Sequence, residues 1–163
     1  MLGAMMNRQL LIASIMRHAA RYHTEQEVVS STVEGVIHRY TYADLDKRSK
    51  QLANALTDLG INRGERIATL AWNTYRHVEL YYGVSGMGGV CHTVNPRLFH
   101  DQLIYIFNHA ADRMVFVDAT FVPILEAIHD RLETVEHYVV LTDREHMPDT
   151  TLPGVLCYEE LVE

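Results

Sequence analysis

The chain has 163 residues, a formal net charge of −7 and a hydrophobic fraction of 48%. This length suits one domain or part of a larger one, and the composition excludes intrinsic disorder. The net negative charge argues against a nucleic-acid partner, because a protein that binds nucleic acid needs a clustered basic surface. Cys91 and Cys157 form no metal-binding or redox motif, so we expect free thiols in a reducing cytoplasm.

The first residues predict a helix rather than a membrane span or a signal peptide. Their apolar run is short, is interrupted by charged residues and has no small-residue cleavage site. Between residues 9 and 22, apolar side chains recur on one face with the spacing of an amphipathic helix; this face contains Leu11, Ile15, Ala19 and Tyr22. We therefore expect a cytoplasmic chain, and we leave peripheral membrane contact open.

A β-hairpin and a long helix are predicted next. Two strand-like runs flank Glu34-Gly35, which suits a hairpin turn. Thr41 is placed to cap the following helix, with Asp44 at the capping-box position. This helix covers residues 42–59 and carries leucines along one stripe, and Gly60 ends it.

From residue 66 onward, predicted strands and helices alternate. We expect strands over residues 66–72, 90–94, 114–117 and 137–141, and helices over residues 74–87, 100–110 and 121–132. Strands this apolar are typical of a parallel sheet that helices cover on both faces. The prediction is an α/β fold with a doubly wound, largely parallel sheet, flanking helices and an N-terminal β-hairpin. The final YEELVE predicts the start of a helix, and we expect the chain to stop inside a domain.

Three closely spaced glycines in GMGGVCHTVNPRLF, residues 86–99, raise the question of a phosphate-binding loop. A P-loop needs a lysine after its glycines, but the two lysines of the chain, Lys47 and Lys50, fall within a predicted helix. A dinucleotide-binding fingerprint lies between a strand and a following helix, whereas these glycines end a helix and enter a strand. We interpret them as a helix C-cap and a close helix–sheet contact.

Two further sequence features give little evidence of a catalytic or metal site. Ser85 in GVSGM nearly matches a nucleophile elbow, but Met87 replaces the last glycine and Ser85 falls inside a predicted helix. None of the ten histidines belongs to a metal-ligand motif, so we interpret them as surface or structural residues and expect no metal site. We assign no catalytic and no cofactor-binding residue.

The Asn95-Pro96-Arg97 turn follows the carboxyl end of a predicted parallel strand, where open α/β sheets bind ligands. Asn95 can bond to neighbouring backbone, and Arg97 can pair with an acidic group or anchor the loop. We favour a scaffold role, but Asn95 and Arg97 remain weak candidates for substrate binding. Asn73 holds the matching place after the preceding strand, where we expect it to cap a helix.

Two long segments resemble the first and second core motifs of the adenylate-forming, or AMP-binding, enzymes. They are RYTYADLDKRSKQLANALTDLGINRGERIATLAWN and YRHVELYYGVSGMGGVCHTVNPRLFHDQLIYIFNHAADRMVFVD. The phrase His-Thr-x-Asn-Pro-Arg-Leu is similar to the medium- and long-chain fatty-acyl-CoA synthetases in particular. The resemblance implies that residues 1–163 are an incomplete N-terminal portion of an adenylation domain. Such enzymes join a fatty acid to ATP and then transfer the acyl group to coenzyme A.

The resemblance also implies which parts of the enzyme lie elsewhere. The family's glycine-rich Pro-Lys loop, its acidic partner, its ribose-binding aspartate and the lysine of its small C-terminal lid domain do not occur in this sequence. ATP, Mg²⁺ and CoA are thus expected for the full-length enzyme and no cofactor on this chain, which we expect to be inactive alone. Its expected partners are the rest of its adenylation domain and further copies of itself. The alternative is a non-catalytic interaction or regulatory module that retains the ligase scaffold.

Overall fold

The computed structural model describes residues 3–4 and 6–163, and its elements follow the predicted alternating order. The helices are α1 (Ile12–Tyr22), α2 (Tyr42–Asp58), α3 (Tyr75–Met87), α4 (His100–Ala110), α5 (Val122–Glu126) and α6 (Tyr158–Leu161). The strands are β1 (Glu27–Ser31), β2 (Ile37–Thr41), β3 (Arg66–Leu70), β4 (Val90–Thr93), β5 (Asp112–Val117), β6 (His137–Val140) and β7 (Leu156–Cys157). Within these described ranges, no helix is both long and apolar enough to span a bilayer.

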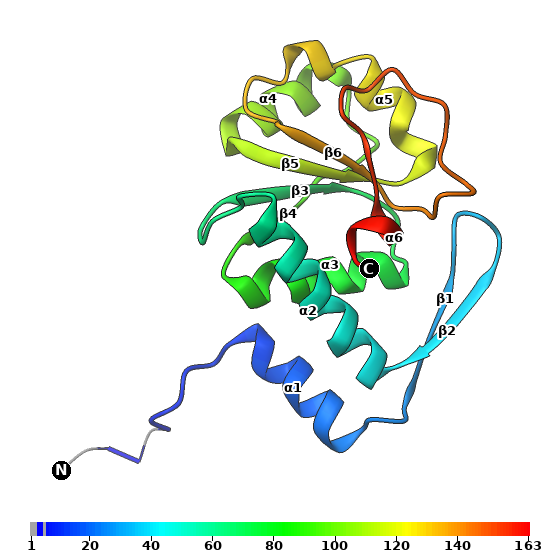
Figure 1. Cartoon of the computed structure of the whole chain (residues 1–163). Helices are drawn as coiled ribbons and strands as arrows, with labels where there is room; N and C mark the ends of the chain where they lie inside the picture. Colours follow the sequence, from blue (N-terminus) through cyan, green and yellow to red (C-terminus); the bar gives the residue numbers. More distant parts are fainter. Residues whose placement is uncertain (1–2, 5) are drawn as a thin grey trace.

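Five parallel strands form the main sheet, in the order β4-β3-β5-β6-β7. Figure 1 shows α4 and α5 on one face of this sheet and α2 and α3 on the other, with α1 outside α2 and α3. Each face has its own buried core: Phe107 and Leu125 belong to one, and Leu52, Leu80 and Tyr158 to the other. The doubly wound α/β sheet and the antiparallel β1–β2 hairpin are therefore confirmed.

The predicted capping signals act as expected at the start of α2 and at the end of α3. The Thr41 hydroxyl accepts a hydrogen bond from the Asp44 amide at 3.3 Å, and the Asp44 carboxylate accepts one from the Thr41 amide at 2.9 Å. Gly88 caps the end of α3 at a φ of +91°, where side chains are disfavoured. A Cβ at Gly89 would lie 3.1 Å from the side chain of Val84, so the chain packs closely as it enters β4.

The predicted amphipathic helix is present as α1, which begins at Ile12, but most of its apolar face is exposed. The exposed fractions of Leu11, Ile12, Ile15 and Tyr22 lie between 48% and 63%. Met16 points inward instead and joins a small core with residues of β2, α2 and α3. Of the apolar stripe named in the sequence analysis, Ala19 packs against this core, together with Met16 and Ala20, which lie outside the stripe.

The predicted helix over residues 121–132 is broken into short pieces. Helix α5 ends at Glu126, and the 3₁₀ turns Ala119–Phe121 and His129–Arg131 stand on either side of it. The side chain of Asn108 in α4 donates to the Arg131 carbonyl and accepts from the Glu133 amide, each at 2.9 Å. Asn108 thus satisfies backbone groups where the chain leaves the second 3₁₀ turn, and the prediction of one continuous helix is wrong.

The N-cap of α3 is Thr74 rather than the predicted Asn73. The hydroxyl of Ser30 in β1 instead accepts a hydrogen bond from the Tyr75 amide at 2.9 Å. A residue of the hairpin thus satisfies the start of a helix 45 positions away. Strand β7 is a further element that the sequence analysis did not predict.

Arg76, in the first turn of α3, joins two segments that lie far apart in the sequence. It is buried, and its guanidinium bonds to Glu34 of the hairpin loop and to Glu159 of α6, each at 2.7 Å. It also donates to the carbonyl of Leu141, just after β6, at 2.9 Å. Burial by itself raises the pKa of Glu159, but hydrogen bonds from Tyr75 and Arg76 outweigh it and the pKa is lowered.

A second arginine, Arg48, extends these ion pairs into the core between α2 and α3. Arg48 bonds to Glu159 and to Glu79, each at 2.7 Å, and Tyr158 donates to the other oxygen of Glu79 at 2.6 Å. Glu79 is fully buried, and burial raises its pKa although Arg48 opposes that shift. We name the five charged residues Glu34, Arg48, Arg76, Glu79 and Glu159 the ionic network.

Arg76→Ala should lower the free energy of unfolding by about 3–5 kcal/mol, because it leaves the mostly buried side chain of Glu34 without a cation and Glu159 with Arg48 alone. Arg144→Ala is the matched control, since its pair with Glu160 is exposed and such pairs contribute less than about 1 kcal/mol. Urea denaturation measures both. Equal losses in the two variants would contradict the role assigned to Arg76.

Candidate functional site: the carboxyl edge of the sheet

The carboxyl ends of the parallel strands share one edge, and this edge is closed at one end by the hairpin. Figure 1 shows the β1–β2 hairpin and α6 on the same side of the molecule. Thr142, two residues after β6, donates a hydrogen bond at 2.9 Å to Glu34 of the hairpin loop. The loop therefore occupies the end of β6, and the ends of β3, β4 and β5 remain for a ligand.

Asp118, directly after β5, is the most unusual side chain at this edge. It is only 1% exposed, and one carboxylate oxygen accepts a hydrogen bond from the backbone amide of Trp72, two residues after the end of β3. The other oxygen, Oδ1, is buried and has no partner among the described residues. Buried carboxylate oxygens usually have a hydrogen-bond partner, so this unpaired oxygen sets Asp118 apart from the other polar groups of the edge.

Burial raises the pKa of Asp118 to about 6, against the opposing hydrogen bond from the Trp72 amide. The carboxyl group can therefore gain or lose a proton near neutral pH, which is a property of acid–base residues and also of some structural ones. Beside it, the Trp72 indole donates to the Thr120 hydroxyl at 3.1 Å and lies 5.0 Å from the Phe121 ring. Trp72 stays 44% exposed, so it presents an aromatic surface at the open end of the edge.

The Asn95-Pro96-Arg97 turn lies at the end of β4, where the sequence places it. The Asn95 side chain accepts a hydrogen bond from the Arg97 amide at 3.0 Å, so Asn95 closes its own turn as a scaffold residue does. The Arg97 side chain is exposed, and the described part of the chain gives it no ion pair or hydrogen bond. A substrate contact by Arg97 therefore remains a prediction. Among the described residues, no acidic side chain pairs with Arg97.

Histidines and cysteines have structural surroundings. His77 is buried between the Thr69 hydroxyl and the Trp72 carbonyl, and burial lowers its pKa. His92 is 2.8 Å from the buried Asp112 at the opposite edge of the sheet. Both cysteines are free thiols. Across the described ranges, no three His, Cys, Asp or Glu side chains gather in a way that would hold a metal ion.

Sequence reasoning missed Asp118 and named only its neighbours along the edge. The available signal was an acidic residue directly after the apolar run MVFV, at the carboxyl end of a predicted parallel strand. Position alone does not reveal burial, and burial is what raises the pKa of this carboxyl group. Asp118 and Trp72 come from neighbouring strands, whereas Asn95 and Arg97 lie beyond β3 at the edge strand.

Asp118→Asn should gain stability relative to the wild type as the pH rises from about 4 to about 7. The pKa of Asp118 is higher in the folded state than in the unfolded state, so ionisation of this carboxyl group destabilises the folded wild type. This destabilisation is absent below the unfolded pKa of 3.8 and complete above about 6. We expect the difference in unfolding free energy to change by up to about 3 kcal/mol. Urea denaturation across this range measures it, with the exposed Asp149→Asn as control. A difference that is independent of pH would contradict the raised pKa.

Comparison with known proteins gives consistent matches. Residues 15–156 match the family of AMP-binding enzymes. The chain is 48% identical over 163 residues to a 3-methylmercaptopropionyl-CoA ligase of Ruegeria lacuscaerulensis, covering 100% of this chain and 30% of that protein. It is 45% identical over 162 residues to a medium-chain-fatty-acid–CoA ligase of Ectopseudomonas oleovorans, covering 99% of this chain and 30% of that protein.

Solved structures support the fold. The coronafacic acid ligase of Pectobacterium brasiliense superposes with a TM-score of 0.78 at 17% identity, over 92% of this chain and 29% of that one. The chain spans about 30% of the length of the curated relatives named above. The extent of the family match, together with identities of 45% and above, shows that the chain belongs to the family of AMP-binding enzymes.

Proposed function

We propose that the chain is the N-terminal portion of the adenylation domain of a fatty-acid–CoA ligase. The observation that carries this proposal is the identity of 48% and 45% to two ligases, each over 99% or more of this chain. One is named for 3-methylmercaptopropionyl-CoA and the other for medium-chain fatty acids, so an aliphatic carboxylic acid is the substrate class that both names share. The complete enzyme would convert such an acid, ATP and CoA into acyl-CoA, AMP and pyrophosphate, through an acyl-adenylate.

The described residues do not form a triphosphate site. At the carboxyl edge, Arg97 is an exposed cation, but no glycine-rich loop and no lysine accompany it. Lys47 and Lys50 lie on the exposed side of α2 instead. Adenylation needs several cationic or backbone donors in a fixed geometry around the phosphates. We therefore assign ATP, Mg²⁺ and CoA binding to residues outside this chain, and a scaffold role to the chain itself.

The unpaired edge of strand β4 is a surface that a partner polypeptide can cover. Within the described residues it pairs on one side only, with β3. Large apolar side chains on β4 and its neighbours are between 41% and 81% exposed; they are Tyr81, Val90, Phe99 and Tyr105. An unpaired edge and exposed apolar side chains are features that proteins usually cover. The rest of the adenylation domain is the partner we propose for this edge.

The purified 163-residue chain should show no fatty-acid-dependent exchange of pyrophosphate into ATP, because it lacks the phosphate-binding groups of the reaction. A longer chain that includes the following part of the adenylation domain and its lid should show this exchange. The assay uses octanoate, ATP and Mg²⁺ with radiolabelled pyrophosphate.

Two outcomes of this assay would count against the proposal. Octanoate-dependent exchange by the short chain, surviving further purification, would place a complete site within it. Absence of exchange in the longer, folded chain with any aliphatic acid would favour the alternative of a non-catalytic interaction or regulatory module.

We also propose that the chain self-associates. In the 163-residue chain alone, where the rest of the adenylation domain does not cover β4, the β4 edge and the exposed apolar side chains of α1 both offer surface to a second copy. Light scattering coupled to size exclusion should give a mass of two chains or more, with the share of the larger species rising with concentration. A monomer mass that persists at high concentration would rule out this assembly.

A further inference from the structure

The first part of the chain carries charge of the opposite sign to the rest. Residues 1–24 contain Arg8, Arg17 and Arg21 and no Asp or Glu, although the whole chain has a formal net charge of −7. The first carboxylate along the chain is that of Glu25. A basic segment within an acidic protein is typical of a surface that attracts an anionic partner.

Helix α1 presents apolar side chains to the outside of the molecule. In Figure 1, α1 lies outside α2 and α3, so it is the outermost helix on its side of the sheet. Its N-cap Leu11 and the side chains of Ile15 and Tyr22 are exposed, and their spacing places all three on one helical face. Leu10, just before the helix, is 86% exposed. Apolar side chains that gather on one exposed face usually mark an interaction surface.

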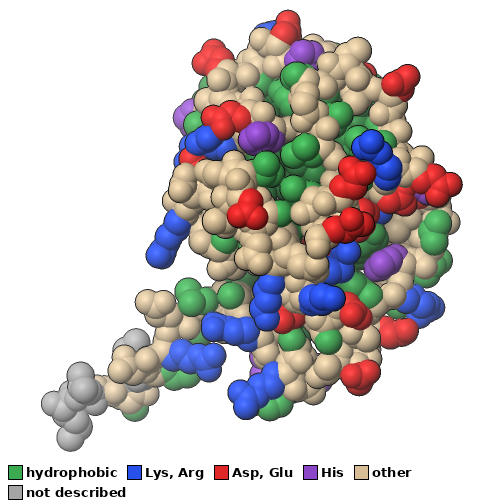
Figure 2. Space-filling view, viewed as in Figure 1, with side chains coloured by type: hydrophobic (Ala, Val, Ile, Leu, Met, Phe, Trp, Pro, Cys, Tyr) green, Lys and Arg blue, Asp and Glu red, His purple; other side chains and the backbone are tan. Residues whose placement is uncertain are grey.

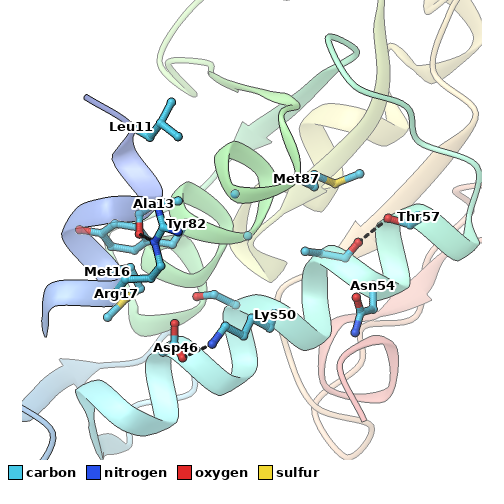
Figure 3. A pocket seen from close by; sticks show the side chains of 14 residues that line it. Leu11, Ala13, Met16, Arg17, Asp46, Lys50, Asn54, Thr57, Tyr82 and Met87 are labelled. Atoms are coloured by element: carbon cyan, nitrogen blue, oxygen red, sulfur yellow. Dashed lines mark hydrogen bonds and ion pairs between the residues drawn. The ribbon is translucent and has the colours of Figure 1, made fainter. Parts of the chain in front are cut away.

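The inner side of α1 holds the helix on the protein. Met16 is buried in the core that it shares with β2, α2 and α3, and Ala19 and Ala20 pack against this core. Figure 3 shows Met16 of α1 next to Tyr82 of α3. The apolar side chains on the outer face of α1 are therefore not the ones that attach it to the protein.

Three arginines border the exposed apolar side chains. Arg17 and Arg21 lie one turn apart on α1, and Arg8 lies on the segment before it. All three line one hollow of about 490 Å³, together with Leu10 and Tyr22. Figure 2 shows Lys and Arg side chains gathered over the region of α1 and α2. Cationic and apolar side chains thus share one part of the surface.

These arginines are exposed, and no carboxylate of the described chain pairs with them. Arg17 donates to the carbonyl of Ala13 in its own helix at 3.3 Å, and Figure 3 shows it apart from Asp46 and Lys50 of α2. Asp46 pairs with Lys50 instead. Guanidinium groups have several donors each, so an external anion can accept hydrogen bonds from them.

We propose that α1 and residues 6–10 dock on the surface of a bilayer that contains anionic phospholipids. Leu11, Ile15 and Tyr22 enter the boundary between headgroups and acyl chains, and the arginines bind lipid phosphates. A tyrosine suits this boundary, because its ring is apolar and its hydroxyl is polar. The proposal goes beyond the ligase function and does not rest on it.

Other occupants fit this surface less well. A two-fold contact between the α1 helices of two copies would bring the same arginines together, and residues 1–24 contain no acidic side chain to offset them. Self-association through the β4 edge leaves α1 open to a bilayer. A soluble phosphate would engage the arginines but would give the exposed apolar side chains no role.

The test is co-sedimentation of the chain with large vesicles of phosphatidylcholine that contain about one third phosphatidylglycerol. We expect binding that is strongly reduced on phosphatidylcholine alone and that weakens as salt is added. Arg21→Gln should weaken binding by about fivefold, the effect of one cation near an anionic surface. The double variant Leu11→Gln/Ile15→Gln should weaken it by about tenfold, because two apolar side chains no longer enter the lipid.

Arg97→Gln and Tyr105→Gln are the matched controls, since they replace an exposed cation and an exposed apolar side chain elsewhere. Tyr105 lies on α4, on the face of the sheet opposite to α1, and Arg97 lies in the turn before α4. Both controls should leave vesicle binding unchanged. Every substituted side chain is exposed, so each variant should keep the melting temperature of the wild type, and loss of binding would not reflect unfolding.

Equal binding to both kinds of vesicle would overturn the proposal, as would binding that Leu11→Gln/Ile15→Gln leaves intact. Displacement from the vesicles by inorganic phosphate at constant ionic strength would overturn it in favour of a site for a soluble anion. Absence of vesicle binding, with loss of self-association in the double variant, would assign the surface to a second copy.

Pyrophosphate exchange by the longer chain, measured without vesicles, should be unaffected by Leu11→Gln/Ile15→Gln. Failure of this inference and failure of the ligase proposal would therefore be seen in different assays.

Discussion

The contact of Arg76 with Glu34 and Glu159 is the constraint on which the arrangement of this molecule depends. It joins the hairpin near the start of the chain, the first turn of α3 and the helix at the end. Removing charges from water is costly, and their attraction repays the cost only when every partner is well placed. Here Tyr75, Arg48 and the Leu141 carbonyl supply the additional bonds, so the hairpin and α6 hold one geometry against the sheet.

This constraint also decides which part of the carboxyl edge is open. Because Arg76 holds Glu34 in place, the hairpin loop covers the end of β6 and bonds to Thr142 there. Asp118 and Trp72, at the ends of the next strands, are left as the polar and aromatic groups of the uncovered part. The raised pKa of Asp118 follows from burial beneath this edge. The same packing thus holds the hairpin over the end of β6 and leaves the ends of β3 and β5 uncovered.

The sequence predicted the elements whose signals are local. The capping box of Thr41 and Asp44, the glycine end of α3 and the apolar parallel strands depend on neighbouring residues, and all are confirmed. Contacts between distant segments were not predictable in this way. The helix expected over residues 121–132 ends at Glu126, and α1 turns Met16 and its alanines toward α2 and α3 while Ile15 and Tyr22 stay exposed. The ionic network was missed for the same reason, since its carboxylates are separated by up to 125 positions from Glu34 to Glu159.

Native-state hydrogen exchange tests most directly the claim that the ionic network makes the hairpin, α6 and the sheet one cooperative scaffold. The account predicts that the hydrogen-bonded amides of β1, β2 and α3 exchange with nearly the same free energy of opening as those of β3 and β5. Urea should lower all of these free energies together. Exchange of the hairpin amides at a much smaller free energy, insensitive to urea, would show that the hairpin opens alone and would contradict the account.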